Sequence, residues 1–497
     1  MKKAISLICL SALLLTNTAC GQDNSDDNTE DSRSSDLTAD DSTEVETVDE
    51  RYLIKEELPE RDFGGYTFTI HMRHSQTPVW ANDMFSDGES GDVVSDAVYR
   101  RNLAVSERFN VNFELALSTT DPNYNHDARP SILAGDDVYD LVAAHGNAAF
   151  DYAREGLCLD YRELEYIDLD KPWWDQDAKN SFTINDKLYV MVGDFSHMSL
   201  AYTDALLFNK NLFDEYNLEY PYQTVLDGDW TFDEFSKLAK QCSEDLNGDG
   251  LYKPEDDLFG YISYQWIGPI NTIVSGGGRI VDKDESGELV LSVNTERNQD
   301  LLSDYMSLYD SQFCYVEGDR NAADHGYFNE LDCRMIFGEN RALFCDANII
   351  DVEYLRDMTD DFGIIPFPKY DIEQERYYTT VDAGTNLYFV PVTASDPERT
   401  SIILEALAAE GYREVIPAYY EVALQTKYTR DDLSVQMLDL IKESRVFDIG
   451  YYIYNGPLSY AGKELYWSSD RGFASFYAKN ESAANVLLDE INETYGK

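Results

Sequence analysis

Strand-like and helix-like segments alternate along the first part of the chain, and this alternation constrains the fold more than any other feature. Residues 66–72 and 111–117 alternate apolar and polar-leaning side chains, which predicts strands. Residues 95–109 lie between them and predict a helix, and residues 139–144 predict a buried strand. Strand, helix and strand in this order predict an α/β unit with a largely parallel sheet.

The later part of the chain continues this pattern. Thr231 is expected to cap a helix, with Glu234 completing a capping box, and Pro397 lies in the first turn of a helix expected through residue 409. Further strands are expected at residues 187–193, 279–282 and 386–392. Residues 361–368 predict a strand followed by a loop, and residues 205–218 predict a strand that runs into a short helix.

Charge and cysteine content narrow the classes of function. The chain has 497 residues and a formal net charge of −55, and a field of this sign repels nucleic acid and anionic membrane surfaces. Five cysteines follow residue 20, so they cannot all pair within one chain, and no C-x-x-C or Cys/His metal spacing occurs. We expect mostly small core residues at Cys158, Cys242, Cys314, Cys333 and Cys345.

Residues 1–19 resemble a bacterial lipoprotein signal peptide. Two lysines precede an apolar stretch of about twelve residues, which is too short to span a bilayer. Ala19, Cys20 and Gly21 then resemble the lipobox, in which Asn17 stands where leucine is usual. The resemblance implies lipidation of Cys20 and an extracytoplasmic lipoprotein anchored to the cell membrane. Ordinary secretion with cleavage nearby is the alternative.

Residues 20–60 are expected to form a tether behind that anchor. Residues 21–50 contain twelve acidic residues, one arginine and no aromatic residue, so they cannot bury enough apolar surface to offset chain entropy. We therefore expect this acidic segment to be disordered. No other stretch is long and apolar enough to cross a membrane.

A collinear set of segments then points to a known family. The set comprises DDVYDLVAAH, LLFNKNLFDEYNLEYP, WTFDEFSKLAKQCSEDLNGDGLYKPEDDLFGY, RMIFGENRALFCDANI, DFGIIPFP and GTNLYFVPVTASDPERT. Together these segments resemble the extracellular solute-binding proteins, family 1, of ABC importers, which are similar to maltose-binding protein. The resemblance runs from about residue 63 to the C-terminus.

The resemblance implies an α/β, periplasmic-binding-protein-like fold of two lobes, with a ligand cleft between them. Crossing hinge strands are implied near residues 199–207, 381–388 and 427–434. Lobe 1 would comprise residues 61–200 plus 386–430, and lobe 2 residues 201–385 plus 431–497. A solute that touches both lobes stabilises the closed state through its differential affinity.

The implied function is capture of a sugar or oligosaccharide by a monomer that delivers it to an ABC transporter permease. Another polar solute, such as a peptide, a polyamine or iron, remains an alternative, and the Tyr-Tyr pairs at 377–378, 419–420 and 451–452 prompt the iron hypothesis. A lipid-anchored glycosidase and an adhesion or scaffold role are further alternatives. The chain has no G-x-S-x-G, no H-E-x-x-H and no phosphate-binding glycine loop, so we do not expect an enzyme.

The candidate ligand contacts combine aromatic faces for C–H surfaces with polar groups for hydroxyls. They are carried over from positions that match the family at strand ends, hinges and the C-terminal segment. Ala144 stands where some relatives have a stacking tryptophan. The candidates are Tyr202, Asp204, Tyr264, Trp266, Asp346, Asn348, Tyr466, Trp467, His145, Asn147 and Asp382. Each of them could instead serve packing, a turn or a cap.

Two other features have competing interpretations. The loop DLNGDG resembles an EF-hand, with ligands expected at Asp245, Asn247, Asp249, Leu251 and Asp256. It is either a structural calcium site remote from the solute or a polar turn, and no other cofactor is expected. The pair Trp173 and Trp174 could line the cleft, but packing is the favoured interpretation.

Overall fold

The computed structural model describes residues 49–496, apart from residues 75–78, 319–332, 356–357, 429–431 and 455. The predicted signal peptide, the lipidation at Cys20 and the tether through residue 48 lie outside the described residues. Across the described ranges, no helix combines the length and apolar character needed to span a membrane.

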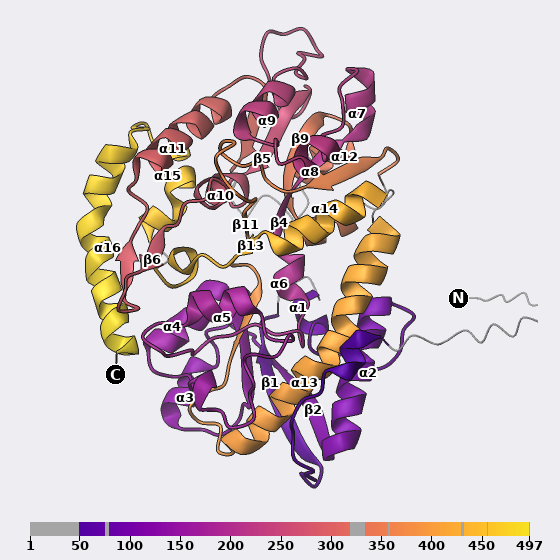
Figure 1. Cartoon of the computed structure of the whole chain (residues 1–497), viewed down its shortest axis with the longest axis vertical. Coiled ribbons are helices and arrows are strands. Elements are labelled where there is room, and N and C mark those ends of the chain that lie inside the picture. Colours follow the sequence, from indigo (N-terminus) through magenta and orange to yellow (C-terminus); the bar gives the residue numbers. More distant parts are fainter. Residues whose placement is uncertain are drawn as a thin grey trace, which may run out of the picture. The chain divides into compact units, whose positions relative to one another are not determined.

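Lobe 1 is built on a four-stranded sheet in the order β12-β3-β1-β2, shown in the lower half of Figure 1. Strand β1 runs parallel to β2 and β3, and β12 runs antiparallel to β3. The predicted, largely parallel sheet is therefore confirmed. Its strands are β1 (Tyr66–Met72), β2 (Val111–Leu117), β3 (Leu141–His145) and β12 (Asn386–Phe389). Its helices are α1 (Val79–Asn82), α2 (Val93–Phe109), α3 (Arg129–Ala134), α4 (Gly146–Arg154), α5 (Gln176–Phe182) and α13 (Pro397–Pro417), with short turns η1 (Glu50–Leu53) and η2 (Tyr161–Glu163).

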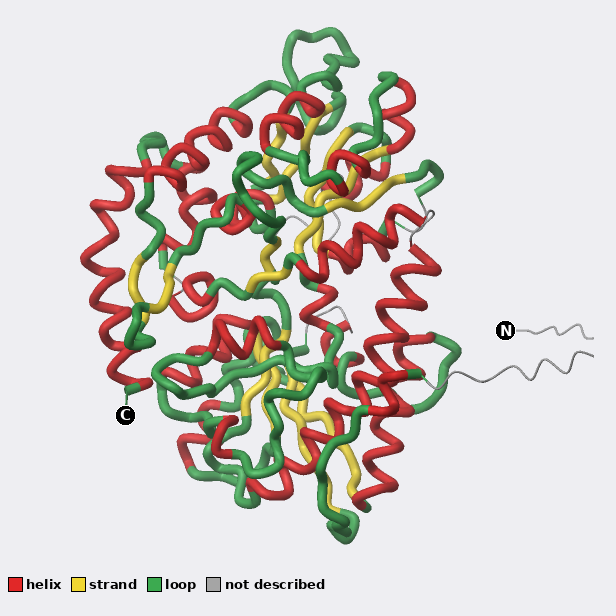
Figure 2. Tube along the Cα trace, in the orientation of Figure 1, coloured by secondary structure: helices red, strands yellow, loops and turns green. Residues whose placement is uncertain are grey.

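Lobe 2 is built on a five-stranded sheet in the order β10-β4-β9-β5-β8 (Figure 2). Strand β5 runs parallel to β8 and β9, whereas β4 runs antiparallel to β9 and β10. Its strands are β4 (Asp204–Asn209), β5 (Phe259–Tyr264), β8 (Cys314–Glu317), β9 (Ala342–Asn348) and β10 (Phe362–Ile365). Around it lie α7 (Lys210–Glu215), α8 (Tyr222–Leu226), α9 (Phe232–Ala239), α10 (Gly268–Ser275), α11 (Glu296–Tyr309), α12 (Cys333–Gly338), η3 (Ile349–Glu353), α14 (Asp432–Glu443), η6 (Pro457–Tyr460), α15 (Ala461–Trp467) and α16 (Phe473–Tyr495), with the hairpin β6 (Val281–Lys283) and β7 (Leu289–Leu291).

The chain crosses between the two sheets at paired segments. After α6 (Met198–Ala201), Thr203 forms an antiparallel bridge with Val381, and the Asp382 N–H donates to the Tyr202 carbonyl over 2.8 Å. Two of the three predicted crossings, near 199–207 and 381–388, are therefore observed. The third runs from η4 (Ala418–Tyr428) toward α14 and includes residues 429–431, which lie outside the described residues.

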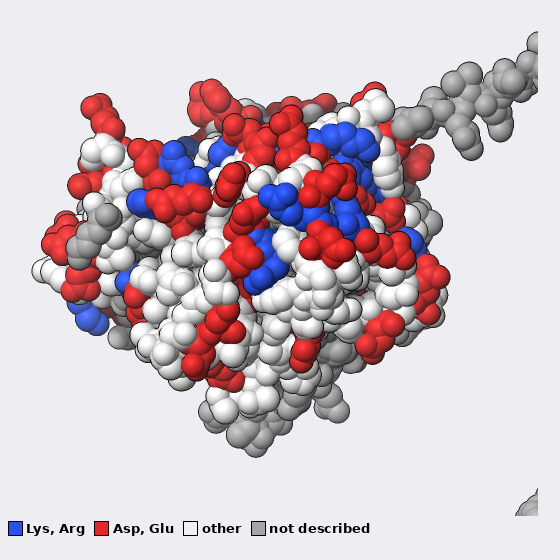
Figure 3. Space-filling view, turned by 90° about the horizontal axis from the view of Figure 1, so that it is seen from below, with Lys and Arg blue, Asp and Glu red and all other residues white. Residues whose placement is uncertain are grey.

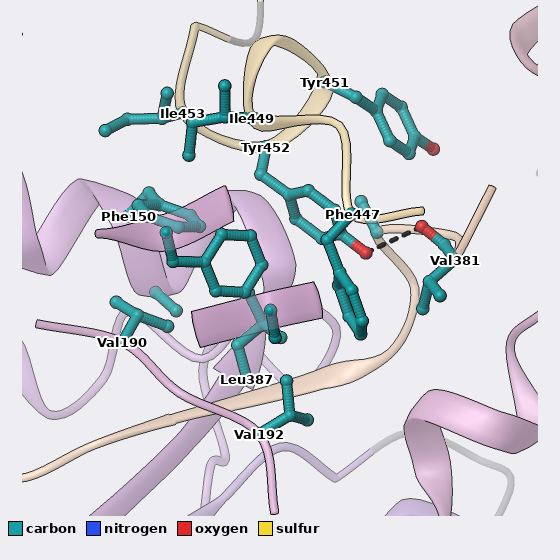
Figure 4. Close-up of a cluster of buried hydrophobic side chains, with 14 of the residues drawn as sticks. Phe150, Val190, Val192, Val381, Leu387, Phe447, Ile449, Tyr451, Tyr452 and Ile453 are labelled. Carbon is teal, nitrogen blue, oxygen red and sulfur yellow. Dashed lines mark hydrogen bonds between the residues drawn. The ribbon is translucent and has the colours of Figure 1, made fainter. Parts of the chain in front are cut away.

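A further segment supports the crossing strands. Strand β13 (Arg445–Val446) pairs with β11 (Thr379–Thr380), and η5 (Gly450–Tyr454) follows it. Figure 4 shows the Tyr452 ring among apolar side chains of both lobes, with its hydroxyl donating to the Val381 carbonyl over 2.6 Å. The adjacent Tyr451 ring points away from this cluster. The hinge thus has an apolar core on one side and a tyrosine on the other.

Two local predictions are wrong. Residues 187–193 form no strand but only isolated bridges, such as Met191 with Tyr388. Their apolar pattern reflects burial, since Leu188, Val190 and Val192 are at most 1% exposed. Thr231 is the N-cap of α9, but its side chain makes no capping hydrogen bond, so the predicted capping box with Glu234 is not formed.

The end of the predicted tether is also corrected. Residues 49–60 pack against lobe 1: Arg51 forms an ion pair with Glu421 at 2.8 Å, and Arg413 forms one with Glu56 at 2.6 Å. Ile54 and Leu58 pack against the core. Apolar side chains and acids with basic partners therefore hold the chain in place from residue 49 onward.

Two core predictions are confirmed. All five cysteines after residue 20 are free and buried. Trp173 and Trp174 are at most 1% exposed, and their indole N–H groups each donate over 2.9 Å to one oxygen of the buried Glu405 carboxylate. The tryptophan pair is therefore a packing element, fixed by a glutamate of α13.

Candidate functional site

The strand directions bring the polar ends of both sheets toward the crossing segments. In lobe 1, β1 and β3 end at Met72 and His145, and β12 begins beside His145. In lobe 2, β9 ends at Asn348, which pairs with Asp204 at the start of β4. Ligands of open α/β sheets bind outside the carboxyl ends of their strands. The side chains at these ends therefore define the candidate site.

Lobe 1 contributes a cation and aromatic rings. Arg73 follows β1, and its Nη1 donates to the Gly384 carbonyl over 2.5 Å while its guanidinium lies 3.6 Å from the centre of the Trp80 ring. At the end of β3, the His145 ring lies 4.7 Å from the Tyr124 ring. Burial, followed by the nearby Arg73, holds the pKa of His145 well below its usual value. His145 is therefore neutral at physiological pH.

The crossing strands place a carboxylate between the lobes. Asp382 accepts hydrogen bonds from the Gly384 N–H (2.6 Å) and from the Tyr451 hydroxyl (2.9 Å). A Cβ at Gly384 would lie 2.6 Å from the Asp382 carboxylate and 2.9 Å from the Tyr202 ring, so only glycine fits here without rearrangement. Burial raises the pKa of Asp382 above its usual value. Each carboxylate oxygen has two acceptor sites, so Asp382 retains acceptor capacity for a solute.

Lobe 2 contributes a second carboxylate with an unused oxygen. Asp204 is 1% exposed, and its Oδ1 accepts a hydrogen bond from Asn348 Nδ2 over 2.7 Å. Its Oδ2 has no hydrogen-bond partner among the described residues. Burial, followed by the carboxylates of Asp382, Asp346 and Asp351, raises the pKa of Asp204 well above its usual value. A buried acceptor without a partner is costly, which favours a donor supplied from outside the chain.

Asp346 supports this edge from beneath. Its carboxylate accepts hydrogen bonds from the Tyr261 and Ser263 hydroxyls and from the Tyr264 N–H. Burial raises the pKa of Asp346 to about 7. Because Asp346 is 2% exposed and already has three donors, the structure places it as a brace for the end of β5.

Aromatic rings of the C-terminal segment extend the site. The Tyr451 and Tyr460 rings lie 5.9 Å apart, edge to face, and Tyr460 and Trp266 follow at 5.6 Å. The Lys463 ammonium lies 3.8 Å from the centre of the Trp266 ring. Burial raises the pKa of Tyr460, and Tyr124 of lobe 1 and Asp382 raise it further. Tyr460 thus lies where groups of both lobes and the hinge converge.

The structure separates the sequence candidates into two groups. Tyr202, Asp204, Asp382, His145 and Trp266 lie at the converging ends described above. The others have contacts that suit support or packing, and their ligand roles remain predictions. Asn147 donates to the Tyr451 and Tyr452 carbonyls, Asn348 to Asp204, the Tyr466 ring packs on Tyr309, the Trp467 indole donates to Gln265, and the Tyr264 N–H donates to Asp346.

The sequence analysis missed several residues of this site. Arg73 directly follows a predicted strand. Because ligands bind outside the carboxyl ends of strands, the sequence could have predicted it. Tyr451 lay in a tyrosine pair considered only for iron. Trp80, Tyr124, Tyr460 and Lys463 carried no local signal.

The tyrosine pair at 451–452 does not have the arrangement that iron binding requires. The Tyr452 hydroxyl is used by the Val381 carbonyl, and the two rings point in different directions (Figure 4). Burial raises the pKa of both phenols well above the usual value. Their hydroxyls donate to different acceptors, the Asp382 carboxylate and the Val381 carbonyl.

The loop predicted for calcium is internally hydrogen-bonded. Both oxygens of Asp245 accept backbone N–H groups of Gly248 and Gly250 at 2.7 Å, and Lys253 forms an ion pair with Asp249 at 2.5 Å. Over the described residues, no group of three or more His, Cys, Asp or Glu side chains is arranged to hold a metal ion. Calcium binding by this loop stays a prediction, and Lys253 would have to leave Asp249 for it.

The surface carries the acidic excess of the sequence. In Figure 3, acidic side chains spread over the visible face, and basic side chains gather in groups beside them. Exposed arginines pair with acids, as Arg61 does with Glu398 at 2.8 Å. A surface of this sign repels polyanions at a distance.

Comparison with known proteins shows the fold. No family model matches the sequence, and no curated protein sequence matches it. The GacH receptor of Streptomyces glaucescens, solved unliganded and with acarbose, is 12% identical with a TM-score of 0.56, covering 86% of this chain and 99% of that one. A cyclo/maltodextrin-binding protein with maltotetraose is 13% identical with a TM-score of 0.53, covering 86% and 96%. UgpB of Mycobacterium tuberculosis with glycerophosphocholine is 14% identical with a TM-score of 0.53, covering 86% and 98%. The chain therefore has the two-lobed, periplasmic-binding-protein-like α/β fold, with strands that cross at the hinge.

Proposed function

We propose that this chain is the extracytoplasmic solute-binding protein of an ABC importer and that it captures a sugar or oligosaccharide between its lobes. One observation carries the proposal: the carboxylates Asp204 and Asp382 and aromatic rings of both lobes converge beside the crossing strands. Carboxylates accept hydrogen bonds from hydroxyls, and aromatic faces pack against the C–H surfaces of sugar rings. A solute held in this way contacts both lobes and stabilises their closed arrangement.

The similar structures support this ligand class without fixing it. Acarbose and maltotetraose occupy two of them, whereas UgpB contains glycerophosphocholine. The same fold thus holds sugars and other polar solutes. Asp204 and Asp382 can exchange hydrogen bonds with hydroxyl groups, which favours a solute rich in hydroxyls.

The setting of the receptor is part of the proposal. A lipid on Cys20 and the acidic segment after it would hold the lobes near a membrane permease. The permease would bind the closed form of the receptor. The similar proteins named above are binding proteins, and we assign no catalytic role to the carboxylates of this site.

A solute screen tests the proposal. The chain would be heated with single monosaccharides, oligosaccharides, peptides, polyamines or glycerophosphocholine. A bound solute at one hundred times its Kd adds about 2.7 kcal/mol to the free energy of unfolding, which raises the unfolding temperature by several degrees. We expect at least one sugar or oligosaccharide to give this rise and to be recovered unchanged.

Two outcomes would contradict the proposal. A rise with peptides, polyamines or glycerophosphocholine and with no carbohydrate would assign the site to another solute. Hydrolysis of an oligosaccharide by the chain would favour the glycosidase alternative.

A further inference from the structure

The two lobes meet at a second place, away from the crossing strands. The C-terminal helix α16 ends with Tyr495, which is 1% exposed, and its ring lies 5.0 Å from the Tyr189 ring of lobe 1. Asn492 of α16 exchanges two hydrogen bonds with Leu289 of β7, at 2.8 and 3.0 Å. In Figure 1, α16 runs along the side of the molecule from the lobe 2 elements toward those of lobe 1. We refer to this contact of residues 180–189 with α16 and the β6–β7 hairpin as the seam.

A tight turn of lobe 1 fits into the seam. Ile184 and Lys187 exchange backbone hydrogen bonds at 3.0 and 2.8 Å around Asn185 and Asp186, which have φ values of 46° and 60°. Two residues with positive φ between bridged neighbours make a hairpin turn that holds its shape. Arg162 braces the turn, because its Nη1 donates to the Asp186 carbonyl over 2.6 Å and to its carboxylate over 2.9 Å.

A cavity of about 660 Å³ lies beside this turn. Its charged lining comprises Arg162, Asp168, Asp170 and Lys179 of lobe 1 and Lys283 of β6, and Asn180 lies among them. Its volume falls within the range of about 300–1,000 Å³ that is typical of small-molecule sites. The lining comes from both lobe 1 and the lobe 2 hairpin, so a molecule bound there would contact both.

The charges around this cavity leave one cation without an acid. Lys179 is fully used, since its ammonium donates to Asp170, Gln176 and the Leu169 carbonyl. Lys283 donates to the Asn180 carbonyl, and no carboxylate among the described residues forms an ion pair with it. Burial lowers the pKa of Lys283, which reflects the cost of this poorly compensated charge. Acidic residues outnumber basic ones in this chain of net charge −55, so a lysine such as Lys283, without a carboxylate partner in the described part of the chain, is unusual.

We propose that this cavity is a second binding site, for a small organic anion whose carboxylate or phosphate group binds Lys283 and Arg162. Lys283 has ammonium protons to spare, and Arg162 engages Asp186 through Nη1 alone, so its other donors remain for the anion. Asn180 and Asp168 would form hydrogen bonds with the other polar groups of the anion. A bound anion stabilises the seam, because it bridges Lys283 of the hairpin and Arg162 of lobe 1. This site is separate from the proposed sugar site and does not depend on it.

Thermal unfolding with two anions tests the proposal. Citrate supplies carboxylates and glycerol 3-phosphate supplies a phosphate, each compared with NaCl at equal ionic strength. At least one anion should raise the unfolding temperature beyond the effect of NaCl, and the more effective anion identifies the group recognised. Losing a charge-assisted hydrogen bond weakens binding by about tenfold or more, so Lys283→Met and Arg162→Met should each weaken it by that amount.

Matched variants keep the test sharp. Lys187→Met removes a neighbouring lysine that pairs with Glu163 at 3.1 Å and does not line the cavity, and it should bind the anion as the unaltered chain does. Lys283→Arg keeps the charge and should also bind. Asp382→Ala should leave anion binding unchanged, which separates this site from the sugar site. Equal effects of both anions and NaCl, or an undiminished anion effect in the double variant Arg162→Met/Lys283→Met, would overturn the proposal.

Discussion

Replacing Glu405 by alanine should lower the free energy of unfolding by roughly 3–5 kcal/mol. The change removes the acceptor of two buried indole N–H groups, those of Trp173 and Trp174, and of the Asp168 backbone N–H. Each donor left without a partner costs about 1–3 kcal/mol. Burial raises the pKa of Glu405 to about 7, so removing the carboxylate returns part of this loss. Urea unfolding followed by tryptophan fluorescence measures the change.

The control lies on the same helix. Glu398 of α13 is about half exposed and forms an ion pair with Arg61 at the surface. Glu398→Ala should therefore cost less than about 1 kcal/mol. If Glu405→Ala cost no more than Glu398→Ala, the carboxylate would not be fixing the tryptophan pair. The segment after this pair reaches the hinge, because Asp175 forms an ion pair with Arg445 at 2.6 Å.

Replacing Asp382 by alanine should weaken binding of the sugar found in the screen by about a hundredfold, the equivalent of two hydrogen bonds to a charged acceptor at about 1.5 kcal/mol each. Asp382 lies on a crossing strand, between the Gly384 N–H and the Tyr451 hydroxyl. The change also leaves the Gly384 N–H and the Tyr451 hydroxyl without this acceptor, so it should lower the free energy of unfolding as well. Burial raises the pKa of Asp382, so removing the carboxylate returns part of that loss. Affinity is therefore compared at a temperature where circular dichroism shows the variant to be folded. Isothermal titration calorimetry measures the affinity.

A second aspartate of the same connection serves as the control. Asp371 forms an ion pair with Arg297 and lies outside the candidate site. Asp371→Ala should leave sugar affinity unchanged. Unchanged affinity in Asp382→Ala would remove this residue from the site and weaken the case that the hinge contacts the solute.

Local sequence patterns predicted the elements that depend on neighbouring residues. The bounds of β1 and β2 match residues 66–72 and 111–117, because alternation along a half-buried strand is a local property. The first turn of α13 was equally visible, since Asp396 caps it and Pro397 follows. Residues 187–193 show the limit of this reasoning. Their apolar and polar residues alternate as in a strand, but this alternation reflects only which side chains are buried. Whether the segment forms a strand depends on backbone partners far along the chain, such as Tyr388 for Met191.

The candidate site depends on such distant partners, which explains why the sequence analysis found only part of it. His145 and Asp204 were predicted because they match positions at which the resembled family places ligand contacts, beside recognisable strands. Tyr460 was missed because its neighbours Tyr124 and Asp382 come from segments that are distant along the chain. The partner of Trp173 was hidden for the same reason, since Glu405 lies 232 positions further along the chain.

The central claim is that two lobes close around a solute that both of them contact. Small-angle X-ray scattering of the chain, without and with a saturating concentration of the sugar found in the screen, tests this claim directly. The account predicts a smaller radius of gyration with the sugar, reversed when the sugar is removed. An unchanged radius of gyration, at a concentration where calorimetry shows the site to be full, would contradict it.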